Sequence, residues 1–91
     1  MQKKFDFYSD PGHGWIKVPV SLLEKLGIAD KITPYSYRRG DFAYLEEDCD
    51  AGTFIVAYKE ATGDYPNCRP HIADKSSKIR SYWSYGADRF A

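Results

Sequence analysis

The sequence predicts one small α+β domain, in which an antiparallel sheet carries two helices on one face. Short segments of alternating apolar and polar residues are separated by turns, and two other segments have apolar residues at helical spacing. A chain of 91 residues is long enough for one modest core and too short for a second domain. The predicted order is β-β-α-β-β-α-β over residues 1–91, with the last six residues expected to fray.

The amino-terminal segment is predicted to form a β-hairpin. Residues 3–8 alternate, with both phenylalanines on one face. Residues 10–12 are Asp, Pro and Gly, a composition typical of a turn, and residues 15–18 resume β character. His13 near the tip of the loop is expected to be exposed, and it is a candidate contact residue.

The first helix is predicted directly after Pro19. Ser21 and Glu24 match a capping box, in which the two side chains satisfy free amides at a helix start. Leucines between them and just beyond supply an apolar stripe. Gly27 is expected to end the helix.

A second hairpin is predicted from residues 35–38 and 42–46, which flank a turn containing Gly40. A second helix follows, because apolar residues recur at helical spacing over residues 51–62. Asp48 or Asp50 is expected to cap this helix, and Gly63 to terminate it. Residues 78–85 alternate and are predicted to be the last strand.

The charges balance overall but are unevenly distributed. The chain has 13 basic and 13 acidic residues, which removes a whole-protein attraction to nucleic acid or anionic lipid. Residues 41–64 carry 7 acidic residues and 1 basic residue, between two mildly basic flanks. The two cysteines are too few for a disulfide scaffold, and neither a secretion signal nor a membrane-spanning run is present. We therefore expect a cytoplasmic protein without membrane association.

No cluster of residue types reaches the specificity of a catalytic or metal motif. Cys68 and His71 have a C-x-x-H spacing, but His13 and Cys49 stand alone, whereas structural zinc sites usually show two close ligand pairs. Whether Cys68 and His71 take part in a metal site is left open. The same residue types offer only chance nucleophilic arrangements. We therefore expect no catalytic residue, no metal and no cofactor.

Tyrosine, tryptophan and arginine are instead concentrated in the second hairpin and near the carboxyl terminus. These residue types dominate binding energy at protein interfaces, which favours a non-enzymatic protein that binds a macromolecule, most readily another protein. The same rings and cations also suit single-stranded nucleic acid, which is the alternative. The identity of the partner and the oligomeric state stay open. The candidate binding residues are Tyr35, Tyr37, Arg38, Arg39, Arg80, Tyr82, Trp83 and His13, and we expect them to converge on one outward platform.

The acidic segment 46–50 has two interpretations. Its carboxylates can complement the dipole of the following helix, or they can imitate phosphate charge and occupy the basic groove of a partner. The sequence leaves both open.

Two resemblances add to these expectations. Residues 15–28 and 40–45 resemble the strand, proline, short helix and returning strand of AbrB-type swapped-hairpin DNA-binding domains, with a departure at residues 33–37. Residues 8–15, 35–41 and 45–50 together resemble a group of small uncharacterised proteins from bacteriophages and mobile elements. The second resemblance implies an accessory protein in a bacterial host cytoplasm that modulates a host process or a defence system.

Overall fold

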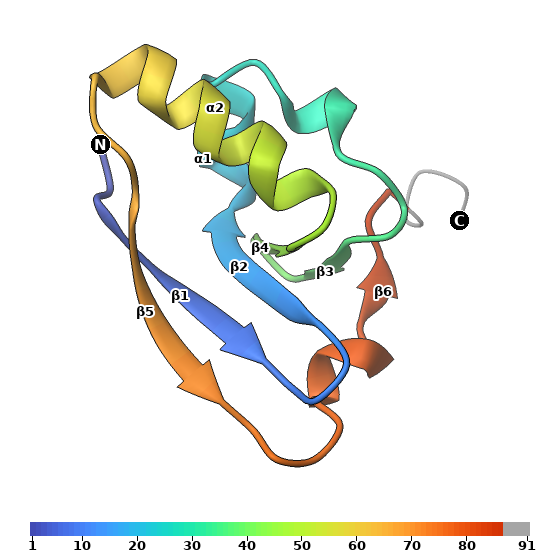
Figure 1. Ribbon diagram of the computed structural model, residues 1–91. Coiled ribbons are helices and arrows are strands. Elements are labelled where there is room, and N and C mark those ends of the chain that lie inside the picture. The colour runs from blue at the N-terminus through green and yellow to red at the C-terminus, as the bar shows by residue number, and fades with distance from the viewer. Residues whose placement is uncertain (87–91) are drawn as a thin grey trace.

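The computed structural model describes residues 1–86. Six strands form one mixed sheet in the order β5-β1-β2-β4-β3-β6, and the two α-helices lie together against one face of it (Figure 1). The elements are β1 (Lys4–Ser9), β2 (Gly14–Pro19), α1 (Val20–Lys25), η1 (Ala29–Lys31), β3 (Tyr37–Arg39), β4 (Phe42–Glu46), α2 (Asp50–Thr62), β5 (Asn67–Ile72), η2 (Lys78–Ser81) and β6 (Trp83–Ser84). The predicted α+β class is confirmed, and the expected fraying of the last six residues falls almost wholly on residues 87–91, outside the described part.

Both predicted hairpins form. β1 pairs with β2 in an antiparallel register that places Phe7 opposite Ile16. β3 and β4 pair across the turn at Gly40, whose φ of 59° is a conformation that glycine adopts without strain. The pairing of β2 with β4 joins the two hairpins into one sheet.

The sheet is mixed because of β5, a strand that the sequence analysis did not predict. This segment runs parallel to β1 along the edge of the sheet, and all of its residues are exposed. It contains Pro70 and has no apolar alternation, so its composition indicates a loop. An edge strand tolerates proline, because its outer side pairs with no further strand and therefore needs no amide donor there.

The first helix begins at Val20, one residue before the predicted capping box, and no side chain caps it. The amide of Val20 donates to the carbonyl of Asp41 instead, at 2.8 Å. The turn between β3 and β4 therefore supplies the acceptor for the first amide of the helix, and the prediction of a Ser21–Glu24 capping box is wrong. Gly27, at a φ of 73°, follows the helix as expected.

The second helix is confirmed, and Gly63 ends it in the left-handed conformation. The predicted cap is wrong, because Cys49 occupies the N-cap position without a side-chain hydrogen bond. Asp50 is only 1% exposed, and its carboxylate accepts hydrogen bonds from the amide and hydroxyl of Thr33 and from the hydroxyl of Ser36. Asp50 therefore joins α2 to the segment before β3.

The main core lies between the sheet and the helices. Phe5 of β1 packs edge-on against Phe54 of α2 at 5.1 Å and against Tyr58 at 5.7 Å. Aliphatic side chains of β2, β4 and α1 complete this layer, and they include the fully buried Val18 and Leu45. Burial of these side chains supplies the main driving force for folding.

A second, smaller cluster covers the opposite face of the sheet. Trp15, Tyr44 and Ile79 are buried there, with Tyr8, Tyr37 and Tyr82 packed around them. Ile79 belongs to η2, so the carboxyl-terminal segment crosses this face and closes it (Figure 1). The predicted strand over residues 78–85 is wrong in its first half, because the hydroxyl of Ser77 accepts a hydrogen bond from the amide of Ile79 and starts a helical turn.

Within residues 1–86, no helix is long and apolar enough to cross a membrane.

Candidate functional site

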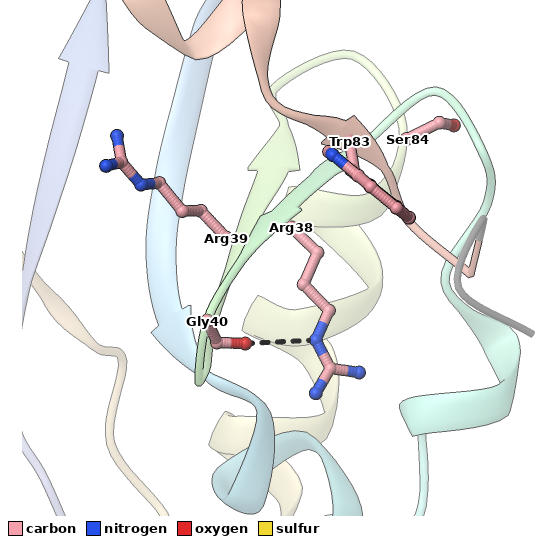
Figure 2. Close-up of a pocket in the computed structure, with 5 residues that line it drawn as sticks. All are labelled: Arg38, Arg39, Gly40, Trp83 and Ser84. Atoms are coloured by element: carbon pink, nitrogen blue, oxygen red, sulfur yellow. Dashed lines mark hydrogen bonds between the residues drawn. The ribbon is translucent and has the colours of Figure 1, made fainter. Parts of the chain in front are cut away.

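One candidate surface lies where β3 meets β6 at the edge of the sheet. A hollow of about 290 Å³ is lined there by Arg38, Arg39, Gly40, Trp83 and Ser84 (Figure 2). Trp83 is 62% exposed, an unusual position for the largest apolar side chain. The Nε of Arg38 donates to the carbonyl of Gly40 at 3.2 Å, which fixes the guanidinium below the indole in the view of Figure 2. The exposed indole of Trp83 and the guanidinium of Arg38 thus frame one concave surface.

The predicted binding residues are divided between the two faces of the sheet. Arg38 pairs with Trp83 across the ladder, and Tyr37 pairs with Ser84. Residues opposite each other share a face and neighbours along a strand alternate, so Trp83 and Arg38 lie on one face while Tyr37 and Arg39 lie on the other. Figure 2 shows Arg39 pointing away from Arg38 and Trp83. The expectation of one common platform is therefore wrong, and the role of each residue in binding stays a prediction.

On the Tyr37 face, the aromatic side chains are occupied by one another. The guanidinium of Arg39 lies 5.1 Å from the centre of the Tyr82 ring, which packs against Tyr44 at 5.0 Å. Burial raises the pKa of the Tyr44 hydroxyl. These rings form a closed cluster and leave little free ring surface for a base to stack on.

A second hollow, of about 420 Å³, opens beside the turn between β1 and β2. His13 and Cys49 face it from separate loops, together with two carboxylates and several rings. Its lining residues are His13, Trp15, Tyr35, Tyr37, Glu46, Asp48, Cys49 and Arg80. Four of the predicted binding residues, His13, Tyr35, Tyr37 and Arg80, thus do meet around one cavity.

The wall of this second hollow is fixed by an ion pair between Asp10 and Arg80. The Arg80 guanidinium donates to both carboxylate oxygens of Asp10, at 2.7 and 2.8 Å, and lies 5.5 Å from the centre of the Trp15 ring. The amides of Gly12, His13 and Ser77 also donate to this carboxylate. The Arg80 guanidinium, with these amides, holds the pKa of Asp10 far below its usual range. Arg80, predicted as a contact residue, therefore has its charge matched within the fold.

A histidine and a cysteine of the predicted C-x-x-H spacing lie on β5. His71 pairs with Tyr8, on which its ring stacks at 4.8 Å, whereas Cys68 pairs with Phe5 of the helix-covered face. The odd separation along a strand therefore points the two donors to opposite faces of the sheet. This geometry excludes a metal site that takes both Cys68 and His71, which the sequence had left open.

The neighbours of His71 form a small polar cluster. Its Nε2 and the Nε of Arg69 both lie 2.8 Å from one oxygen of Asp6. The hydrogen bond from Arg69, followed by that from His71, lowers the pKa of Asp6. The basic charge at this edge is thus partly neutralised.

Sequence reasoning did not connect Glu46 and Asp48 with His13. The Nδ1 of His13 lies 3.2 Å from Oε1 of Glu46, across 33 positions of the chain. No spacing rule joins residues so far apart, and only the pairing of β2 with β4 brings the two loops together. The charge of the acidic segment marked it as a candidate site, but nothing in the sequence indicated that His13 would lie beside it.

Comparisons of this chain with protein-family models, with curated proteins and with solved structures found no match.

Proposed function

We propose that this chain is a non-enzymatic binding module that docks onto another protein through the β3–β6 edge of its sheet. The observation that carries the proposal is the 62% exposure of Trp83, which shares its face of the sheet and its hollow with Arg38. Tryptophan and arginine are the residue types most enriched among those that dominate binding energy at protein interfaces. An exposed indole also leaves apolar surface in water that a partner would cover.

The nature of the partner follows from the charge of this edge. Arg38 borders the hollow on the same face as Trp83, so a partner surface with an apolar centre and an acidic rim complements it. In line with the resemblance to bacteriophage and mobile-element proteins, the proposed partner is a protein of the bacterial host, whose activity docking modulates.

A protein partner is favoured over nucleic acid by the state of the rings on the Tyr37 face. Tyr8, Tyr44 and Tyr82 pack on one another or on His71, rather than presenting open faces to bases. Arg69 and Arg80 are paired with carboxylates, which reduces the positive charge available to phosphates.

The experiment is affinity capture from native cell extract, with the wild-type chain compared with Trp83→Ala and Tyr65→Ala. Tyr65 is a matched control, because it is 68% exposed but lies in the turn between α2 and β5. We expect Trp83→Ala to weaken binding of the captured protein by about 2 kcal/mol, or about 30-fold. Tyr65→Ala should bind as the wild type does.

Nuclease treatment and a salt titration separate the two classes of partner. A protein contact at this edge should survive nuclease and weaken only modestly as salt rises. Capture that disappears with nuclease and falls steeply with ionic strength would favour the nucleic-acid alternative instead. Equal capture by wild type and Trp83→Ala would overturn the proposal.

A further inference from the structure

A cluster of metal-ligating groups lies at the second hollow, away from the Trp83 edge. One nitrogen of His13 and one oxygen each of Glu46 and Asp48 lie within 4.8 Å of one another. They come from the β1–β2 turn, the end of β4 and the loop before α2. Imidazole nitrogen and carboxylate oxygen are both ligand types that divalent first-row transition-metal ions accept.

The separation of His13 and Glu46 fits two ligands of one ion. Two ligands that each lie about 2.0–2.1 Å from a tetrahedral Zn²⁺ are separated by about 3.4 Å. Nδ1 of His13 and Oε1 of Glu46 are 3.2 Å apart, close to this value. Asp48 is exposed, so rotation of its side chain can bring its oxygen the remaining distance.

Backbone hydrogen bonds hold the loops that carry these groups. Oδ1 of Asp10 accepts the amide of His13 at 3.0 Å, and the amide of Asp10 donates to the carbonyl of His13 at 2.9 Å. On the other side, Oε2 of Glu46 accepts the amide of Asp48 at 2.9 Å, which leaves Oε1 directed at His13. The amide of Glu47 donates to the carbonyl of Gly14 and ties the two loops together. The ligand set is thus largely preorganised.

The charge around the cluster also favours a cation. Arg80 also lines this hollow, but its guanidinium donates hydrogen bonds to both carboxylate oxygens of Asp10, which balance its charge. Among residues 1–86, no lining residue other than Arg80 and His13 offers a positive charge to the carboxylates of Glu46 and Asp48.

We propose that His13, Glu46 and Asp48 form a binding site for a divalent first-row transition metal ion such as Zn²⁺. One imidazole nitrogen suits such an ion better than Mg²⁺ or Ca²⁺, which prefer oxygen ligands alone. Three side-chain ligands leave a fourth position open to water. The thiol of Cys49 stays outside the ligand set, because it donates to the carboxylate of Asp50 at 3.7 Å. Binding would clamp the β1–β2 turn to the loop before α2, independently of any protein docked at Trp83.

The first test is calorimetric titration of the chain with Zn²⁺. We expect saturable one-to-one binding that is weakened at least tenfold in His13→Ala and in Asp48→Asn, since loss of an outer-shell partner alone costs about 10–100-fold. His71→Ala is the matched control, because His71 also pairs with a carboxylate, that of Asp6, but has no third ligand within residues 1–86. It should bind Zn²⁺ as the wild type does. Equal binding by wild type and His13→Ala, or loss only in His71→Ala, would overturn the site.

Tryptophan fluorescence reports where the ion sits. In a Trp83→Phe background the remaining tryptophan is Trp15, whose ring centre lies 6.1 Å from that of His13. Ni²⁺ or Co²⁺ at the proposed site should quench this fluorescence, and the added His13→Ala change should abolish the quenching. Quenching that persists without His13 would place the ion elsewhere and contradict the proposal.

Stability and spectroscopy complete the test. Zn²⁺ should raise the melting temperature of the wild-type chain, but not that of His13→Ala, because a ligand that binds only the folded state stabilises it. A Co²⁺ complex should show no sulfur-to-metal charge-transfer band. Such a band, or equal stabilisation by Mg²⁺, would refute the ligand set proposed here.

Discussion

Arg80 reaches across 70 positions of the chain to bind Asp10 with two parallel hydrogen bonds, and so fastens the carboxyl-terminal segment onto the first hairpin. The carboxylate is fully enclosed, while the guanidinium is partly exposed over the ring of Trp15. Geometry of this bidentate kind is both strong and selective. This pair and the buried side chain of Ile79 both hold η2 on the second face of the sheet.

The Asp10 contact predicts a specific pH dependence of stability. The hydrogen bond from Arg80, with the amides around it, lowers the pKa of Asp10 in the folded chain. A lowered folded-state pKa contributes stability above the unfolded value of about 3.9, and this stability is lost as the pH falls toward the folded pKa. The free energy of unfolding, measured in urea, should therefore fall more steeply between about pH 4 and pH 2 for the wild-type chain than for Asp10→Asn.

Asp74→Asn is the control for this experiment, because Asp74 is exposed in the loop after β5. Its pH profile should follow that of the wild type. Parallel pH profiles for the wild type and Asp10→Asn would contradict the claim that the lowered pKa of Asp10 contributes to stability.

Replacing Asp50 should be among the most destabilising single changes. The substitution Asp50→Ala removes a buried acceptor and leaves the amide of Thr33 and the hydroxyl of Ser36 without their partner. Loss of a buried charged acceptor of this kind costs about 2–4 kcal/mol. The free energy of unfolding in urea at pH 7 measures this cost. Asp48→Asn, a substitution at an exposed residue nearby, should change the free energy of unfolding by less than about 0.5 kcal/mol. A small effect at Asp50 would mean that the network is dispensable.

Replacing Gly14 and Gly52 by alanine should change the stability of the fold in opposite directions. A Cβ at Gly14 would lie 2.4 Å from the tip of the Phe7 ring and 2.8 Å from a carboxylate oxygen of Glu47, so Gly14→Ala should destabilise the fold by about 1–3 kcal/mol. Gly52 lies within α2, with open space around it, and Gly52→Ala should stabilise by about 0.5–1 kcal/mol. Thermal unfolding of both variants checks the pair, and a stabilising Gly14→Ala would show that the contact relaxes freely.

The reactivity of Cys68 should be low for an exposed residue. Burial of its thiol against the helix-covered face raises the pKa of Cys68, so the reactive thiolate is scarce at neutral pH. In a Cys49→Ser variant, alkylation of Cys68 should accelerate only at a pH above the usual thiol value. Rapid alkylation at neutral pH would instead revive a catalytic interpretation of this thiol.

The local signals in the sequence predicted the hairpins and the second helix well. Turn residues at Gly40, a left-handed terminator at Gly63 and apolar spacing between them act over a few residues, so they can be read without knowledge of the rest. The caps were predicted poorly, because Val20 and Asp50 found partners in distant segments rather than in their own helices. β5 was missed because its pairing with β1 comes from the backbone, and its side chains carry no apolar pattern.

By itself the sequence determined the α+β class, the hairpins and the residue types available for contact, since these follow from short-range periodicity and turn chemistry. The tertiary structure alone decided which side chains meet. Strand alternation separated Trp83 from Tyr37, and the pairing of β2 with β4 brought His13 to Glu46. The physical reason is that the facing of a side chain depends on strand register, which is set by the packing of the whole sheet rather than by neighbours in sequence.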